Sequence, residues 1–282
     1  MLEPIEKRIE REVAKAKEQY GKYLYHYTSI SALSKILKSK TFLLGNTANM
    51  NDSSEIMDFI DRILNVVSKK VDNTNPKLKE SINYVKNGAA KDYPYAMCLS
   101  YGYEDASLWE RYANFAEGVC IAFDIEEFYK LLFIDHIAID HIYYDYDENQ
   151  HKLVEIIKDF IEGRDTHDFD SLDSIISNIT LCGVCHKHKS FISEREVRVV
   201  SLVQPENRRK VFLEKDGMFK DMEPIDLSNI CSKYNINFEA MFGKIILGPR
   251  SKQSILDLQE YIRHLGYEAL AERVEKSACP LR

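Results

Sequence analysis

The apolar residues of this chain change their spacing repeatedly, in an order that is not a strict alternation of strands and helices. Helical spacing predicts helices over 3–20, 30–37, 53–69, 77–87, 108–112, 148–162, 170–181 and 251–265. Short apolar or alternating runs predict strands over 23–27, 41–44, 95–101, 118–124, 137–144 and 244–247, with the longest strand over 190–203. This order favours an α+β fold with antiparallel or mixed sheets and peripheral helices over a doubly wound parallel sheet.

The sequence has no linker rich in Pro, Gly or Ser that would divide it into separate domains. Its 282 residues are 45% hydrophobic, which is enough for a substantial core. We therefore expect an N-terminal helix over residues 1–22 and a single catalytic-type domain over residues 23–282.

The composition also limits the compartment and the partners. No run of about 18 apolar residues occurs, and the charged segment over 1–21 lacks the pattern of a signal peptide. We expect a cytoplasmic protein without a membrane span, whose six cysteines are reduced. Because the net charge is −7, a nucleic-acid partner would need a local basic strip such as Arg208-Arg209-Lys210. That strip fits a solvated turn equally well.

Three charged residues alternate in the predicted strand over 190–203. Since side chains two apart on a strand share a face, Glu194, Glu196 and Arg198 are expected to point the same way in steps of about 7 Å. One interpretation is an exposed sheet face with surface ion pairs. The other is a carboxylate held by the arginine beside a binding cleft, where it would stay ionised.

A second candidate site lies where the first strand meets a helix. In Tyr25-His26-Tyr27-Thr28-Ser29, His26 and Thr28 share one face of the strand, and Thr28 or Ser29 can cap the helix that follows. A lone histidine here is commonly structural. The free N–H groups of such a junction, however, favour an anion such as a pyrophosphate.

Further positions have a structural and a functional interpretation. Asn51 and Asp52 fit a helix cap, and the single tryptophan, Trp109, fits core packing together with Tyr112, or stacking on a base in a cleft. Cys182, Cys185, His186 and His188 lie close enough for a zinc site, although packing of the two thiols is the simpler explanation and metal binding stays open. Nucleotide-binding glycine motifs and the Gly-x-Ser-x-Gly elbow are absent from the sequence.

Short motifs that resemble one family follow one another along the chain. They are Tyr25-His26-Tyr27-Thr28-Ser29, Asn51-Asp52-x-x-Glu55, Ser107-Leu108-Trp109-x-x-Tyr112, the strand-like run 118–124, Lys187-His188-x-x-Phe191-x-x-Glu194-x-Glu196-x-Arg198, Ile245-Ile-Leu-Gly248-Pro249 and Ser277-x-x-Pro280-Leu281-Arg282. Each motif is short, but in this order they are similar to the bacterial domain-of-unknown-function family 2971 (DUF2971). The resemblance covers nearly the whole chain from Tyr23.

The opening motif is also similar, more remotely, to the first strand and helix of ADP-ribosyltransferases, including DNA-modifying toxins. In that superfamily a first-strand histidine helps hold the NAD ribose, and a glutamate on a later strand is catalytic. The resemblance implies an ADP-ribosyltransferase-like core with Glu196 catalytic, Glu194 as its companion, and His26 at the NAD ribose. The resemblance implies that His26 and Thr28 bind NAD. The further expected cofactor contacts are Tyr27, Ser29, Asn51, Asp52, Trp109, Tyr112, His188 and Arg198.

Three functions follow as expectations. The first is an NAD-consuming ADP-ribosyltransferase, a toxin or anti-phage defence effector that modifies protein or nucleic acid. In that reaction an ionised carboxylate stabilises the cation formed when the nicotinamide–ribose bond breaks. The alternatives are an NAD glycohydrolase and a non-catalytic ligand-binding or sensor module. The acceptor and the oligomeric state stay open.

Overall fold

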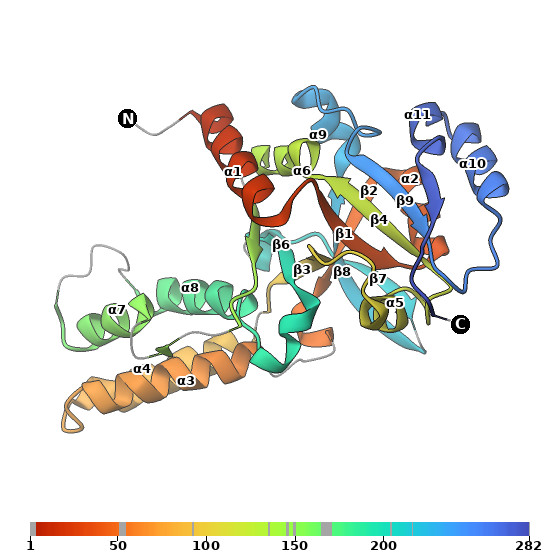
Figure 1. Ribbon diagram of the computed structural model, residues 1–282. Coiled ribbons are helices and arrows are strands. Elements are labelled where there is room, and N and C mark those ends of the chain that lie inside the picture. Colours follow the sequence, from red (N-terminus) through yellow and green to blue (C-terminus); the bar gives the residue numbers. More distant parts are fainter. Residues whose placement is uncertain are drawn as a thin grey trace.

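A computed structural model describes residues 4–50, 55–91, 93–134, 136–144, 147–148, 151–164, 171–203, 205–215 and 217–281. A ten-stranded sheet forms its centre (Figure 1). The strands are β1 (Tyr23–Thr28), β2 (Thr41–Asn46), β3 (Tyr95–Ser100), β4 (Val119–Asp124), β5 (Ile137–His141), β6 (Glu196–Ser201), β7 (Val211–Lys215), β8 (Met218–Asp226), β9 (Phe242–Leu247) and β10 (Val274–Lys276). Neighbouring strands are antiparallel except β9 and β10, which confirms the α+β fold with a mixed sheet.

The sheet divides at β3. One edge of β3 pairs with β6 along its length, from Ala96↔Val200 to Ser100↔Glu196. Its other edge pairs with β1 at Tyr25↔Ser100 and with β2 near Ala96. Beyond β1 lie β4, β9 and β10, and beyond β2 lie β8 and β7. The strand that begins the sheet therefore lies two positions from β6.

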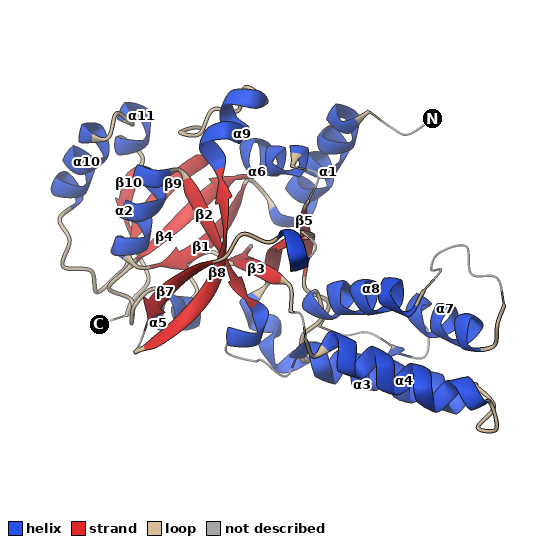
Figure 2. Ribbon diagram, turned by 180° about the vertical axis from the view of Figure 1, so that it is seen from behind, coloured by secondary structure: helices blue, strands red, loops and turns tan. Residues whose placement is uncertain are grey.

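The helices collect in two groups, which Figures 1 and 2 show from opposite sides. Helices α3, α4, α7 and α8 pack together as a lobe beside the sheet, whereas the others lie against the sheet itself. The α-helices are α1 (Ile5–Tyr20), α2 (Ile30–Ser39), α3 (Glu55–Lys70), α4 (Pro76–Ala89), α5 (Ala106–Tyr112), α6 (Ile125–Phe128), α7 (Lys152–Ile161), α8 (Leu172–Val184), α9 (Leu227–Lys233), α10 (Ile255–His264) and α11 (Glu268–Ala271). Short 3₁₀ helices are η1 (Thr47–Asn49), η2 (Tyr129–Phe133), η4 (Lys189–Glu194) and η5 (Pro205–Asn207).

The junction of β1 and α2 forms as the sequence predicts. Ser29 caps α2, because its Oγ accepts a hydrogen bond of 3.1 Å from the N–H of Ala32. Leu33 and Leu37, four residues apart, bury one face of α2 in the main core. Burial of a leucine side chain contributes about 1.5–3 kcal/mol, so these two positions hold α2 on the sheet.

The two faces of β1 meet different surroundings. Leu24 lies in the main core, together with residues of α1, α2 and α10. Tyr27 lies on the opposite face, where its ring forms a T-shaped contact with that of Trp109 at a centroid distance of 5.0 Å. Successive strand residues alternate in this way, so the face of every site residue on β1 follows from its position.

The structure corrects the strand predicted over 190–203. Only Glu196–Ser201 is extended, and η4 (Lys189–Glu194) precedes it. Arg195 joins the two with a left-handed backbone, φ 48°. Glu194 is therefore outside the strand, and the prediction that it shares a strand face with Glu196 and Arg198 is wrong.

The hairpin of β7 and β8 and the helix α9 are missing from the sequence-based prediction. The signal for the hairpin is present, because the sequence Asp216-Gly217 separates two runs of alternating residues. Lys and Asp side chains in these runs obscure the apolar alternation. The longest strand is consequently β8, with 9 residues, and not β6, with 6.

Candidate functional site

Five charged side chains meet at the base of the helical lobe, three of them buried and two, Glu55 and Lys187, nearly so. Glu194 ends η4, Glu196 and Arg198 lie on β6, Glu55 begins α3, and Lys187 follows α8. Glu194, Glu196 and Arg198 are 4%, 5% and 3% exposed, so the interpretation as an exposed sheet face is wrong. Buried charges persist only when they are paired and hydrogen-bonded.

Lys187 is the centre of this network. Its Nζ lies 2.8 Å from Glu194 Oε2, 3.3 Å from Glu196 Oε2 and 3.4 Å from Glu55 Oε1. One ammonium group thus contacts three carboxylates that come from different parts of the chain. The sequence pattern suggested Arg198 as the cation beside Glu194, but in the structure Lys187 pairs with Glu194.

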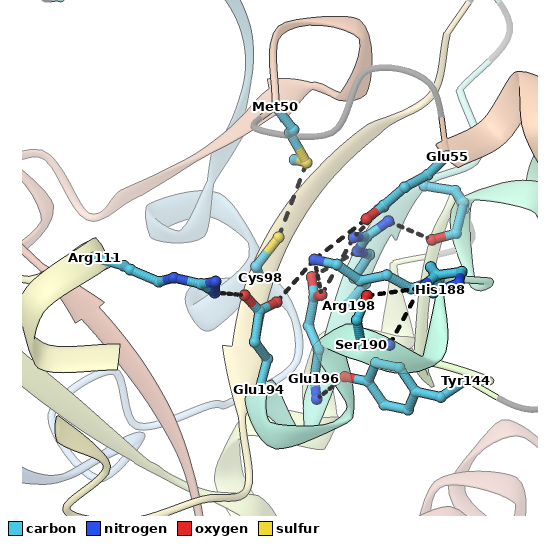
Figure 3. Close-up of polar contacts among 12 residues, drawn as sticks. Met50, Glu55, Cys98, Arg111, Tyr144, His188, Ser190, Glu194, Glu196 and Arg198 are labelled. Carbon is cyan, nitrogen blue, oxygen red and sulfur yellow. Dashed lines mark hydrogen bonds and ion pairs between the residues drawn. The ribbon is translucent and has the colours of Figure 1, made fainter. Parts of the chain in front are cut away.

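Arg198 is the second buried cation (Figure 3). Its Nε donates to Glu196 Oε1 at 2.7 Å, and its Nη2 donates to Glu196 Oε2 and Glu55 Oε2, both at 3.2 Å. Its Nη1 donates to the carbonyl oxygen of Val184, the last residue of α8, at 2.6 Å. Arg198 therefore fastens both α3 and α8 of the helical lobe to the sheet.

A rim of side chains closes the network toward the surface. The guanidinium of Arg111, on the last turn of α5, forms an ion pair with Glu194 Oε1, and Tyr112 Oη donates to the same oxygen at 2.9 Å. The side chain of Arg111 is 47% exposed, in contrast to the buried cations. Glu194 Oε1 is thus paired with a cation that is exposed to solvent and can move away from it.

The buried cations hold Glu196 in its ionised form. Burial alone would raise the pKa of Glu196, but Arg198 and Lys187 outweigh it and bring the pKa to about 2. Burial likewise would lower the pKa of Lys187, but Glu196 and Glu55 raise it. For Glu55 burial dominates, and its pKa is raised although it contacts the same two cations. The difference follows from geometry, because Arg198 Nε and Nη2 grip both oxygens of Glu196 and Nη2 alone reaches Glu55.

His26 lies on β1 and contacts the backbone of β3. Its Nδ1 lies 2.9 Å from the carbonyl oxygen of Cys98 on β3. Tyr25 pairs with Ser100, and Ser100 pairs with Glu196, so these three side chains share a face of the sheet. Alternation places His26 on the other face. By this strand register, His26 and Glu196 lie on opposite faces of the sheet, and their shared pocket stays a prediction.

The remaining predicted contacts have structural partners. Trp109 is fully buried, so core packing is its role and stacking on a ligand in a cleft is excluded in this conformation. Tyr27 Oη donates to the carbonyl oxygen of Gly102 at 3.3 Å, and Thr28 pairs with Val119 on β4. His188 is exposed and caps η4 by accepting from the N–H of Ser190 at 3.2 Å, so it does not reach the buried carboxylates. Asn51 and Asp52 lie outside the described residues.

Sequence reasoning found Glu194, Glu196, Arg198 and Tyr112 but missed their partners. Glu55 and Lys187 stand inside two of the family-like motifs, and Arg111 stands between Trp109 and Tyr112. Each is a charged residue in a helix or loop, where exposure is the usual expectation.

A separate cavity of about 430 Å³ lies at the start of α2. Its lining includes Ser29 and Lys252 and no residue of the network.

The segment over 182–188, which contains two cysteines and two histidines, packs against the helical lobe. His186 Nδ1 lies 2.6 Å from the carbonyl oxygen of Cys182, and the ring stacks on Phe59 with centroids 4.3 Å apart. Among the residues that the structure describes, no group of three or more His, Cys, Asp or Glu is placed to hold a metal ion. All six cysteines have free thiols.

None of the described helices is long and apolar enough to cross a membrane.

The buried His186 makes stability depend on pH. Burial lowers its pKa from 6.5 to about 4, so the unfolded chain binds more protons between these values and stability falls as the pH drops through this window. We expect the free energy of unfolding to decrease by roughly 2 kcal/mol between about pH 7 and about pH 5. Urea unfolding at both pH values measures this decrease in the free energy of unfolding. His186→Gln should flatten this dependence, whereas substitution of the exposed His264 by Gln should leave it unchanged; equal slopes for the two variants would refute the assignment.

One protein family matches part of the chain. A family model described as "Protein of unknown function (DUF2971)" matches residues 108–199, which run from α5 to β6 and include Tyr112, Lys187, Glu194, Glu196 and Arg198. Comparison with curated proteins and with solved structures gives no match. The match over residues 108–199 supports the resemblance of this chain to the DUF2971 family.

Proposed function

We propose that the chain is an NAD-consuming enzyme of the ADP-ribosyltransferase type, with Glu196 and Glu194 as the negative centre of its site. One observation supports this most strongly: Glu196 is buried yet kept ionised, with a pKa of about 2, by Arg198 and Lys187. A fixed carboxylate of this kind stabilises the positive charge that develops on the ribose when nicotinamide leaves.

The rim gives the substrate a route to the carboxylates. Arg111 is exposed and pairs with Glu194, and a guanidinium binds a pyrophosphate as well as it binds a carboxylate. In this proposal Arg111 moves onto the NAD pyrophosphate and frees one side of Glu194 Oε1 for the ribose, while Tyr112 Oη still donates to this oxygen. Glu194 then contacts the substrate first, and Glu196 stabilises the cation from behind it. His26 is not a direct partner of Glu196 in this arrangement.

Purified protein incubated with NAD labelled on the adenylate group, with and without cell extract, tests this function. We expect nicotinamide release together with label on a protein or nucleic-acid acceptor. Free ADP-ribose without a labelled acceptor would instead identify an NAD glycohydrolase. Glu275→Gln is the matched control for Glu196→Gln, because Glu275 is a partly exposed carboxylate paired with Lys244 outside the network. Absence of both nicotinamide release and label transfer would sink the proposal.

A non-catalytic binding module is the second candidate, and the pairing of the carboxylates favours it. Both oxygens of Glu196 are held by Arg198, and both oxygens of Glu194 contact a protein cation. Such a module predicts that NAD raises the melting temperature of the protein without release of nicotinamide. The same preparation therefore separates the two candidates by two readouts.

A further inference from the structure

The β7–β8 hairpin presents an apolar surface at the end of the sheet. β7 is the terminal strand in the order of the described strands. Phe212, Met218 and Phe219 on this hairpin are 67%, 57% and 80% exposed. An edge strand with exposed aromatic side chains is a template for pairing with another strand, unless charge, proline or a covering element blocks it.

The backbone of β7 is oriented for such pairing. Two residues separate Lys215 from Met218, which face each other at the end of the hairpin. In an antiparallel hairpin closed this way the end pair is hydrogen-bonded, and alternate residues turn their N–H and C=O groups outward. Phe212 and Glu214 are the β7 residues that direct these groups to the edge away from β8. A strand that pairs with the outward main-chain groups of Phe212 and Glu214 would therefore also lie beside the exposed Phe212 ring.

We propose that this edge pairs antiparallel with β7 of a second copy of the chain and so forms a twofold dimer with a continuous sheet. The register that sets Phe212 opposite its own copy sets Lys210 opposite Glu214, and the twofold axis repeats this ion pair. Aromatic pairs and opposite charges directly across two strands both stabilise antiparallel pairing. Both charged residues are exposed, and the intermolecular ion pair would replace the present contacts of Lys210 Nζ with the Tyr95 ring (5.7 Å) and of Glu214 Oε1 with the N–H of Gly217 (2.9 Å).

Charge complementarity selects a second copy over an unrelated strand. The run Lys210 to Glu214 is its own complement when reversed, with a cation at one end, a carboxylate at the other and the aromatic ring at the centre. A contact between two short strands is smaller than the standard interface of about 1,600 Å². The dimer therefore dissociates on dilution.

Sedimentation of the full chain from low to high micromolar concentration tests the dimer. The average mass of the native protein should rise from one chain toward two. Phe212→Glu sets two like charges against each other and should weaken association by about tenfold or more. Leu256→Glu, on α10, is the matched control, because Leu256 is a similarly exposed apolar residue (73%) away from the hairpin, and this variant should dimerise like the native chain.

Charge exchange tests the register itself. Lys210→Glu and Glu214→Lys should each weaken the dimer, and the double variant should restore it, because the two ion pairs re-form with reversed sign. A native chain that stays monomeric at every concentration overturns the proposal. So does a dimer that Phe212→Glu leaves intact, or a double variant no better than either single one. These outcomes do not depend on NAD turnover.

Discussion

Arg198→Met should lower the free energy of unfolding by about 3–5 kcal/mol, because it leaves buried carboxylates without their closest cation. Arg198 is 3% exposed and holds both oxygens of Glu196, one oxygen of Glu55 and the carbonyl of Val184. It also connects the helical lobe to the sheet. Methionine fills a similar volume, so the loss reports the missing charge and hydrogen bonds more than a cavity.

Urea unfolding followed by circular dichroism measures this loss, with Arg263→Met as control. Arg263 pairs with Glu260, Glu268 and Glu272 at the surface, where solvent screens the charges and such pairs contribute little to stability. The double variant Arg198→Met with Glu196→Leu should recover part of the loss, since it removes the uncompensated charge as well. A loss for Arg198→Met no larger than that for Arg263→Met would contradict the assignment of the network as the link between lobe and sheet.

Glu196→Gln should reduce the rate of nicotinamide release by about 100-fold or more, if Glu196 stabilises the developing cation. Glutamine keeps the shape and removes the charge. It also leaves Lys187 and Arg198 with one carboxylate fewer, so circular dichroism and a melting curve must accompany the rate. Glu275→Gln, outside the network, should keep the native rate.

A milder variant keeps this prediction testable if Glu196→Gln unfolds. Tyr112→Phe removes only the O–H that donates to Glu194 Oε1 at 2.9 Å. This O–H is one of the donors that hold Glu194 Oε1 in place, so its loss should misplace the carboxylate and lower the rate by roughly tenfold or more while the fold persists. Native turnover in a folded Tyr112→Phe and a folded Glu196→Gln would remove both carboxylates from the proposed chemistry.

Local signals in the sequence predicted much of the fold. The Ser29 cap and the four-residue spacing of Leu33 and Leu37 define α2, and the apolar runs of β3 and β4 define central strands. These features depend on neighbours in the chain, so periodicity and capping are sufficient to find them. The boundary of β6 was not predictable in this way, because the left-handed backbone of Arg195 carries no glycine signal.

The site was predictable only in part, since its partners come together through tertiary structure. Glu194 and Glu196 stand out in the sequence, but Lys187 gains its role from lying between them and Glu55, which precedes it by more than a hundred residues. His26 shows the reverse case. Its motif suggested a shared site with Glu196, and only the pairing of Tyr25, Ser100 and Glu196 reveals that His26 faces the other way.

A crystal structure with a non-hydrolysable NAD analogue tests the central claim most directly. We expect the ribose next to the nicotinamide to contact Glu194, with Glu196 behind it and Arg111 moved from Glu194 onto the pyrophosphate. The Lys187 and Arg198 contacts to Glu196 should persist. An analogue bound elsewhere, for example in the cavity at Ser29 and Lys252, with Arg111 still on Glu194, would contradict the account.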